Sequence, residues 1–207
     1  MVKAGSPRYI YSMRAKKSLG QHFLHSEKAL SQIVDAGEIR KTDVVLEIGP
    51  GHGVLTERLL VVANKVIAIE KDRELIPLLQ EKFASYVTTG TLTLIEADVL
   101  EFDPSTIKES YKLIANIPYY ITGAIIEQFL STTTQPSQMV LLVQKEVAER
   151  IVARDGKQSI PSIAVQAYGH ASIVAKVPAG AFNPPPKVDS AILLIENINR
   201  SFFTDCD

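Results

Sequence analysis

Short apolar runs alternate with amphipathic segments along the first 155 residues of the chain. The runs are rich in Val and Ile, whereas the segments between them carry apolar residues at helical spacing. The runs predict strands at residues 44–49, 65–70, 91–98, 111–116 and 139–145, and the segments predict helices at 53–63, 72–85 and 122–131. Because parallel strands are joined through crossover helices, this alternation predicts a parallel sheet with helices on both faces.

The remainder of the chain predicts a different end to the sheet. Residues 146–154 and 159–169 have helical patterns, and residues 171–178 and 190–196 indicate strands. Only the loop at 179–189 joins these two strands, without a crossover helix. We therefore expect an α/β protein with a Rossmann-like, doubly wound sheet of seven strands, mostly parallel, with an antiparallel finish.

The composition is that of an ordinary globular protein, with 46% apolar and 22% charged residues among 207. The single cysteine, Cys206, rules out a disulfide framework or a cysteine-built metal site and favours a reducing compartment. The longest apolar runs, at 59–63 and 140–143, fall far short of a membrane span. We expect a cytoplasmic monomer that binds neither a metal nor a membrane.

Charge is unevenly distributed along the chain. Residues 1–26 contain five Lys and Arg side chains and no acid, whereas the net charge of the whole chain is −1. A basic N-terminal arm therefore precedes an acidic body. Such an arm can contact nucleic acid, or it can be a solvated tail.

A glycine-rich turn follows the first predicted strand. In EIGPGHG, Gly49, Gly51 and Gly53 stand between that strand and a helix, where a doubly wound sheet binds nucleotide-like ligands. A dinucleotide fingerprint, G-x-G-x-x-G, requires glycine at the position of Val54, so the turn disfavours NAD.

Acidic residues end the next two predicted strands. Glu70 follows Gly49 by roughly 20 residues, a spacing suited to a carboxylate that binds two ribose hydroxyls. Asp98 could accept a hydrogen bond from the exocyclic amine of an adenine. An acid at the tip of a strand, as Glu70 is, could instead cap the helix that follows it. Because the carboxyl ends of parallel strands meet at one edge, both acids are expected near the glycine turn.

The fourth predicted strand ends in Asn116, Ile117, Pro118 and Tyr119. Pro118 fixes its own φ and keeps Ile117 extended, so the turn is stiff and retains backbone acceptors. The Asn116 side chain adds an acceptor and two donors, and the Tyr119 ring can stack on a flat group. The turn suits a planar ligand that carries an amine; an ordinary strand-to-helix turn with an Asn cap is the alternative.

Several blocks of sequence together resemble a known family. EIGPGHGVLT, EADVL, NIPYYI, QKEVAERI and FNPPPKVDSA are similar to class I S-adenosylmethionine-dependent methyltransferases, specifically the small-subunit rRNA adenine N-6 dimethyltransferases of the kasugamycin-sensitivity type. SLGQHFL resembles the N-terminal cofactor motif of that family, usually GQNFL, with His22 in place of Asn. The resemblance extends from Lys16 to Glu196.

This resemblance implies a cofactor, a reaction and a site. S-adenosylmethionine would supply methyl groups, without a metal, to the exocyclic N-6 amines of adenines in small-subunit rRNA during ribosome biogenesis. The residues implied in cofactor binding are Gln21, His22, Leu24, Glu47, Gly49, Gly51, Glu70, Asp98 and Asn116. The residues implied in catalysis are Asn116, Pro118, Tyr119 and Phe182, with the rings of Tyr119 and Phe182 against the target base.

The resemblance also implies a domain organisation. Proteins of this type continue beyond the last strand into a small helical domain that contributes to RNA docking, and we expect that domain to be absent here. The expected parts are a basic arm at residues 1–15, a methyltransferase domain at 16–200 and a truncated tail at 201–207.

Other functions remain compatible with these motifs. A large-subunit rRNA adenine methylase that confers antibiotic resistance shares the NIPY and F-x-P-x-P blocks. A non-catalytic RNA-binding assembly or transcription factor could keep the fold and the cofactor pocket, although intact Asn116, Pro118 and Tyr119 argue against lost catalysis. A dehydrogenase is the least favoured of these functions.

We predict that removal of residues 1–15 lowers the affinity for an rRNA fragment and leaves cofactor binding unchanged. The deletion removes Lys3, Arg8 and Arg14. The slope of log affinity against log salt should shrink by up to about three units if all three contact phosphates. Fluorescence titrations at several salt concentrations measure both slopes, and identical slopes would contradict a role for the arm.

Overall fold

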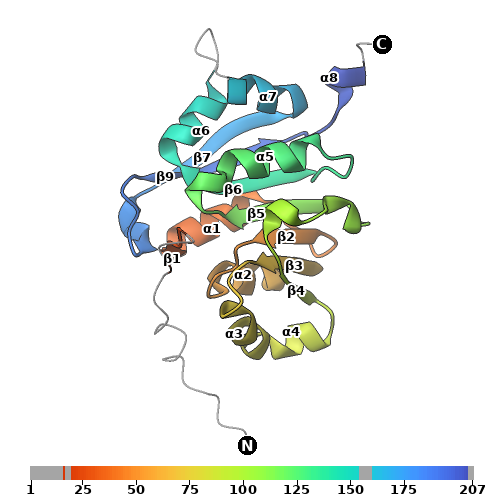
Figure 1. Ribbon diagram of the computed structural model, residues 1–207, viewed down its shortest axis with the longest axis vertical. Helices are drawn as coiled ribbons and strands as arrows, with labels where there is room; N and C mark the ends of the chain where they lie inside the picture. The colour runs from red at the N-terminus through yellow and green to blue at the C-terminus, as the bar shows by residue number, and fades with distance from the viewer. Residues whose placement is uncertain (1–15, 17–19, 154–159, 205–207) are drawn as a thin grey trace, which may run out of the picture.

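A seven-stranded sheet forms the centre of the protein (Figure 1). The computed structural model describes residue 16 and residues 20–153 and 160–204. The strands are β2 (Val44–Ile48), β3 (Lys65–Glu70), β4 (Leu92–Glu96), β5 (Tyr111–Asn116), β6 (Gln138–Gln144), β7 (His170–Val177) and β9 (Ser190–Glu196). Their order is β4-β3-β2-β5-β6-β9-β7; the first five are parallel, and β9 is antiparallel to both of its neighbours. The predicted fold class, including its antiparallel finish, is confirmed.

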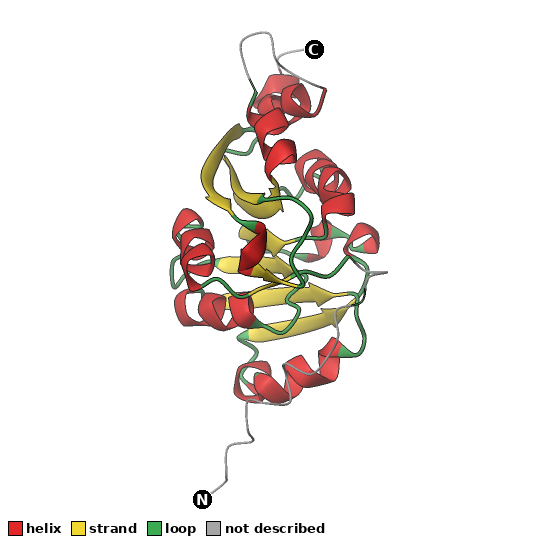
Figure 2. Cartoon of the chain, turned by 90° about the vertical axis from the view of Figure 1, so that its left-hand side faces the viewer, coloured by secondary structure: helices red, strands yellow, loops and turns green. Residues whose placement is uncertain are grey.

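Helices cover both faces of this sheet (Figure 2). Apolar side chains on one face pack against α5 (Thr122–Ser131), α6 (Lys145–Val152) and α7 (Ile160–Tyr168). Those on the other face pack against α1 (Glu27–Ala36), α2 (Val54–Val62) and α3 (Leu75–Lys82). All five residues of β2 are buried, because a parallel strand between two helical layers has no solvent-exposed side.

Two helices differ from the sequence prediction. The pattern did not indicate α1, which begins after Ser26; the side chain of Ser26 caps the helix by accepting from the backbone N of Ala29. The single helix expected at 72–85 is divided into α3 and α4 (Ala84–Thr88) at Phe83, whose φ of −112° and ψ of 26° are not helical. The Phe83 ring is buried, so its packing overrides helical propensity there.

A second, two-stranded sheet links the N-terminal motif to the loop between β7 and β9. Strand β1 (Phe23–Leu24) pairs antiparallel with β8 (Phe182–Asn183), and Leu24 lies opposite Phe182. Residues 201–204 form the short helix α8, whereas the expected arm at 1–15 and residues 205–207 lie outside the described residues. Within the described part of the chain, every helix is too short or too polar to span a membrane.

We predict that Gly53→Ala destabilises the protein more than Gly90→Ala. Both glycines have left-handed φ values, 74° and 75°, so each alanine should cost about 1 kcal/mol. A Cβ at Gly53 would lie 2.5 Å from Cε2 of Phe83, whereas a Cβ at Gly90 would meet nothing within 4 Å. Overpacking should therefore add about 1–3 kcal/mol to the Gly53 variant alone. Urea unfolding measures both losses, and equal losses would contradict close packing of Phe83 on this turn.

Candidate functional site

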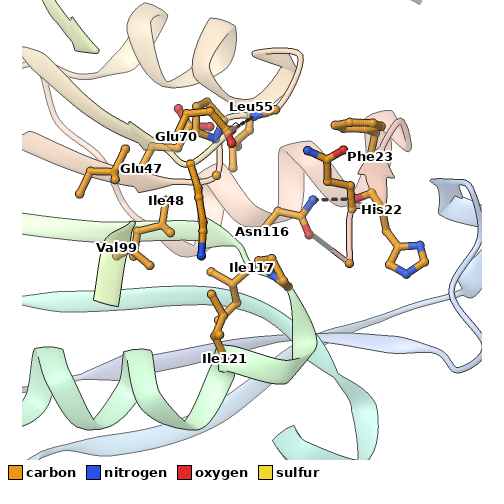
Figure 3. A pocket seen from close by; sticks show the side chains of 18 of the residues that line it. His22, Phe23, Glu47, Ile48, Leu55, Glu70, Val99, Asn116, Ile117 and Ile121 are labelled. Carbon is orange, nitrogen blue, oxygen red and sulfur yellow. Dashed lines mark hydrogen bonds between the residues drawn. The ribbon is translucent and has the colours of Figure 1, made fainter. Parts of the chain in front are cut away.

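The carboxyl ends of β2, β3 and β5 meet at one edge of the sheet, and a cavity of about 170 Å³ lies there. The strand register pairs Ile48 with both Ile69 and Ala115, so the next residue of each strand reaches the same edge. Figure 3 shows Glu47 and Glu70 together on one side of this pocket and His22 on the other. The predicted site residues that line the pocket are Gln21, His22, Leu24, Glu47, Gly49, Gly51, Glu70, Asp98, Asn116, Pro118 and Tyr119.

The glycine turn supplies bare backbone to the pocket. Gly49 and Gly51 have φ values of 68° and 58°, a region that glycine adopts without strain. A Cβ at Gly51 would lie 3.1 Å from the ring of Phe23, and a Cβ at Gly49 would lie 3.6 Å from the carbonyl oxygen of Asn116. Neither glycine therefore presents a side chain of its own to a ligand, and at Gly51 the ring of Phe23 occupies the space that a Cβ would need.

Glu70 is held in place by the backbone on both sides of it. Its Oε2 accepts from the backbone N of Gly51 at 3.1 Å, and its Oε1 accepts from the backbone N of Asp72 at 2.8 Å. The side chain is 6% exposed, and burial raises the pKa of this carboxyl above its ordinary value. Both oxygens keep further lone pairs, so the carboxylate can still accept from two hydroxyls.

Glu47 is the second buried acid of the pocket. It is 1% exposed, and its Oε2 has no hydrogen-bond partner within the described residues. Burial, together with the charge of Glu70, raises the pKa of Glu47 to about 8. Neither acid has an ion-pair partner in the part of the chain that the structure describes. A cationic ligand would therefore suit this side of the pocket, whereas an anionic pyrophosphate would not.

Asp98 lines the pocket with a partly exposed side chain and forms an ion pair through one oxygen. Its Oδ2 is 2.5 Å from Nζ of Lys71, and its Oδ1 accepts from the backbone N of Leu100 at 3.1 Å. The hydrogen bond from Lys71 holds the pKa of Asp98 below its ordinary value, so the carboxyl is ionised near neutral pH. Lys71 also lines the pocket, and an adenine that reached Asp98 would lie beside it.

Asn116 lies opposite the acids, and its amide has a defined orientation. Its Nδ2 donates to the backbone O of His22 at 3.3 Å, as the dashed line in Figure 3 marks. Oδ1 is therefore the side-chain atom that can accept from an amine in the pocket. The predicted acceptor position at the end of β5 is thus built from the N-terminal motif and the NIPY turn together.

Two rings stand beside this amide. The ring centroids of His22 and Tyr119 are 5.9 Å apart with an interplanar angle of 20°. The hydroxyl of Tyr119 is 2.6 Å from Oγ of Ser190, which is fully buried, so the tyrosine ring is anchored to β9. Nδ1 of His22 lies 2.8 Å from the backbone O of Pro184, which links the ring to the proline-rich loop.

Phe182 does not occupy the predicted position. Its side chain is 2% exposed and packs with Leu24 and Ala181 in the core on the α1 side of the sheet, and it is not among the residues that line the pocket. In this conformation the ring is a core side chain and cannot stack on a base. The pairing of β8 with β1 draws the ring inward, a long-range contact that the loop sequence does not reveal.

The sequence interpretation missed several residues of this region, including three polar ones with a place in the site. Lys71 and Tyr120 line the pocket, and Asp72 contacts Gln21 and the neighbouring Lys16. Tyr120 directly follows the NIPY turn, and Asp72 lies two residues after Glu70. The sequence signal that could have drawn attention to Asp72 was a second acid close to the end of β3.

The fold and the site together define the class of this protein. A mixed seven-stranded sheet with a glycine turn after β2 and an acid at the end of β3 is the Rossmann-like methyltransferase fold. Residues 12–207 match the family described as ribosomal RNA adenine dimethylase, and the chain belongs to that family.

Named relatives agree with this assignment. A curated protein from Dehalococcoides mccartyi, "Ribosomal RNA small subunit methyltransferase A", is 48% identical over 188 residues. That alignment covers 89% of this chain but 64% of the relative, so the chain spans less than two thirds of the relative's length.

Two solved structures share the fold at substantial identity. A dimethyladenosine transferase from Plasmodium falciparum has a TM-score of 0.77 and 34% identity, covering 88% of this chain and 66% of that one. The 23S rRNA methyltransferase ErmE has a TM-score of 0.76 and 32% identity, covering 84% of this chain and 69% of that one.

We predict that Glu47→Gln stabilises the folded chain increasingly as pH rises. The pKa of Glu47 is about 8 when folded and 4.5 in its ordinary state, so folded protein binds the extra proton between these values and stability falls as pH rises through them. Gln carries no such proton, so its advantage in unfolding free energy should grow from pH 5 to pH 8 by a few kcal/mol at most.

Thermal unfolding at both pH values measures this effect. Glu96→Gln, which changes an exposed carboxylate at the end of β4, is the matched control and should show no such growth. A stability difference for Glu47→Gln that stays constant with pH would contradict a buried carboxyl at this position.

Proposed function

We propose that this chain is an S-adenosylmethionine-dependent rRNA adenine N-6 dimethyltransferase that acts on the small ribosomal subunit. The proposal gives it the rRNA of that subunit as partner, the cytoplasm as compartment and a monomer as the working form. The family assignment and the name of the Dehalococcoides relative support the reaction and the substrate class.

One observation carries the proposal on structural grounds. Two buried acids, which have no ion-pair partner among the described residues, face the pocket on one side, and an oriented amide acceptor stands on the other. A ligand with a sulfonium and an ammonium group satisfies the first side, and an exocyclic amine satisfies the second. The bare backbone of Gly49 lies beside Asn116, so no side chain at Gly49 stands between these two sides.

The acids and the glycine turn would hold the cofactor. Glu70 would accept from the ribose hydroxyls, and Glu47 would pair through its unpartnered Oε2 with the ammonium group. Asp98 would accept from the adenine amine while keeping Lys71 as its counter-ion. When bound, S-adenosylmethionine supplies a methyl group on a positively charged sulfur, which is open to in-line displacement by an amine.

The NIPY turn would bind and orient the acceptor. The nitrogen of an adenine amine is a poor nucleophile because its lone pair is delocalised into the ring. Oδ1 of Asn116 and a backbone carbonyl in Ile117-Pro118 would accept its two N–H groups, and this favours a tetrahedral nitrogen with an available lone pair. Tyr119, anchored by Ser190, would stack on the face of the base. Positioning of this kind, rather than a general base, is the proposed source of rate.

Methyl transfer to purified ribosomal subunits tests the proposal directly. Small subunits from a strain that lacks the modification should gain N-6 dimethyladenosine, located by mass spectrometry, whereas large subunits should not. Modification of large subunits alone would favour the alternative function, a resistance methylase of large-subunit rRNA, which the similarity to ErmE supports. Binding of S-adenosylhomocysteine without transfer to either subunit would favour a non-catalytic RNA-binding factor.

We predict that Asn116→Ala lowers turnover by about a hundred- to a thousandfold, because a preorganised acceptor at the reacting amine is lost. Cofactor affinity should change far less.

Glu70→Gln is the reciprocal variant, because it should weaken cofactor binding by about ten- to a hundredfold. Calorimetry with S-adenosylhomocysteine and single-turnover methylation separate the two effects. Near wild-type turnover by Asn116→Ala would show that NIPY is only a turn.

A further inference from the structure

Asp72 is a buried acid that lies beside the pocket without lining it. It is 4% exposed, although it stands in the loop after β3, where acids are usually solvated. Its Oδ1 accepts from Nζ of Lys16 at 2.8 Å, and its Oδ2 accepts from Nε2 of Gln21 at 3.0 Å. Oδ1 also accepts from the backbone N of Glu74 at 3.1 Å. Burial opposes ionisation, but the hydrogen bonds from Lys16, Gln21 and this backbone N hold the pKa of Asp72 below its ordinary value. The carboxylate is therefore charged and fully engaged.

The two donors belong to the same N-terminal region and are themselves joined. Oε1 of Gln21 accepts from the backbone N of Lys16 at 2.8 Å. The Gln21 amide thus uses its oxygen on Lys16 and its nitrogen on Asp72. This arrangement closes a ring of hydrogen bonds in which each side-chain orientation is determined by the other two.

The backbone of Asp72 reaches the opposite wall of the pocket. Its N–H donates to Oε1 of Glu70, whose Oε2 accepts from the backbone N of Gly51. A single residue therefore contacts Glu70 through its main chain and Gln21 through its side chain. The glycine turn, the end of β3 and the N-terminal motif are connected through it.

The same connection continues to the acceptor side. His22 directly follows Gln21, and its backbone O receives the hydrogen bond from Nδ2 of Asn116. A shift of Gln21 would move this carbonyl and release the amide that is proposed to orient the target amine. Asp72 is thus connected to both the cofactor side of the site, through Glu70, and the acceptor side, through Gln21 and His22.

We propose that Asp72 is a positioning residue that fixes the Gly20–Leu24 wall of the pocket against Glu70. This inference rests on the proposed function, because it assigns a role in binding the cofactor of that reaction. Stability alone is a poor explanation of the contact. An ion pair to Lys16, which is 33% exposed, adds little to stability, and the burial of the Asp72 carboxylate opposes that gain.

A neighbouring acid provides a matched control. Glu74 also pairs with Lys16, at 3.0 Å, but its side chain is 57% exposed and makes no hydrogen bond to Gln21 within the described residues. Glu74→Gln therefore removes a negative charge from the same lysine and leaves the ring of hydrogen bonds in place. A general effect of charge on Lys16 would appear in both variants, whereas a positioning effect would appear only at Asp72.

Calorimetry with S-adenosylhomocysteine on the full chain tests the inference, at a temperature where thermal scans show each variant folded. Asp72→Asn should raise Kd by about tenfold or more, and Glu74→Gln should change it by less than about twofold. Lys16→Met should also raise Kd, and the double variant Lys16→Met, Asp72→Asn should bind no more weakly than Asp72→Asn alone, because both act through one contact. Turnover at saturating cofactor should fall for Asp72→Asn, through the loosened Asn116 amide.

The outcomes separate this inference from the proposed function. If the wild-type chain fails to bind S-adenosylhomocysteine, the proposed function is overturned and the inference with it. If the wild type binds and Asp72→Asn binds equally well, or if Glu74→Gln loses as much affinity, only the positioning role is overturned. If Asp72→Asn does not fold, Lys16→Met decides, and unchanged affinity in that variant overturns the inference.

Discussion

Parallel strands must end at a common edge of their sheet, and the site depends on this constraint. Strands β2, β3 and β5 arrive in register, so the glycine turn, Glu70 and Asn116 reach the same place from distant parts of the chain. The order of the strands puts β2 between the other two, with the acid on one side and the amide on the other. The cofactor side and the acceptor side of the proposed reaction are consequences of that order.

The second determinant is electrostatic. Ionising both Glu47 and Glu70 is unfavourable for the empty protein, because burial removes hydration from both carboxylates and the charge of Glu70 further opposes ionisation of Glu47. A bound cation would stabilise the ionised forms of both acids, so the pocket favours a positively charged ligand. Asp72 is buried as well, but its carboxylate is ionised because it accepts hydrogen bonds from Lys16 and Gln21. Burial alone therefore does not decide the charge of an acid here.

The sequence predicted the architecture well where local signals were strong. The predicted bounds of β3, β5, α5 and β9 agree with the structure, because each run is rich in apolar or β-branched residues and ends at a charged or turn-forming residue. Helix α1 was missed although its Ser26 cap and first-turn Glu27 were local signals. The break at Phe83, the inward position of Phe182 and the role of Asp72 depend on contacts between residues far apart in the chain. The hydrogen bonds from the Asp72 side chain to Gln21 and Lys16 span 51 and 56 residues, and no local pattern records them.

A crystal structure of the chain with S-adenosylhomocysteine is the most direct test of this account. The account predicts ribose hydroxyls at the Glu70 carboxylate, the ligand ammonium at Glu47 and the sulfur facing the Asn116 side of the glycine turn. Density for the ligand away from Gly49 and Glu70, or a ligand whose sulfur is separated from Asn116 by protein atoms, would contradict the proposed division of the pocket into a cofactor side and an acceptor side.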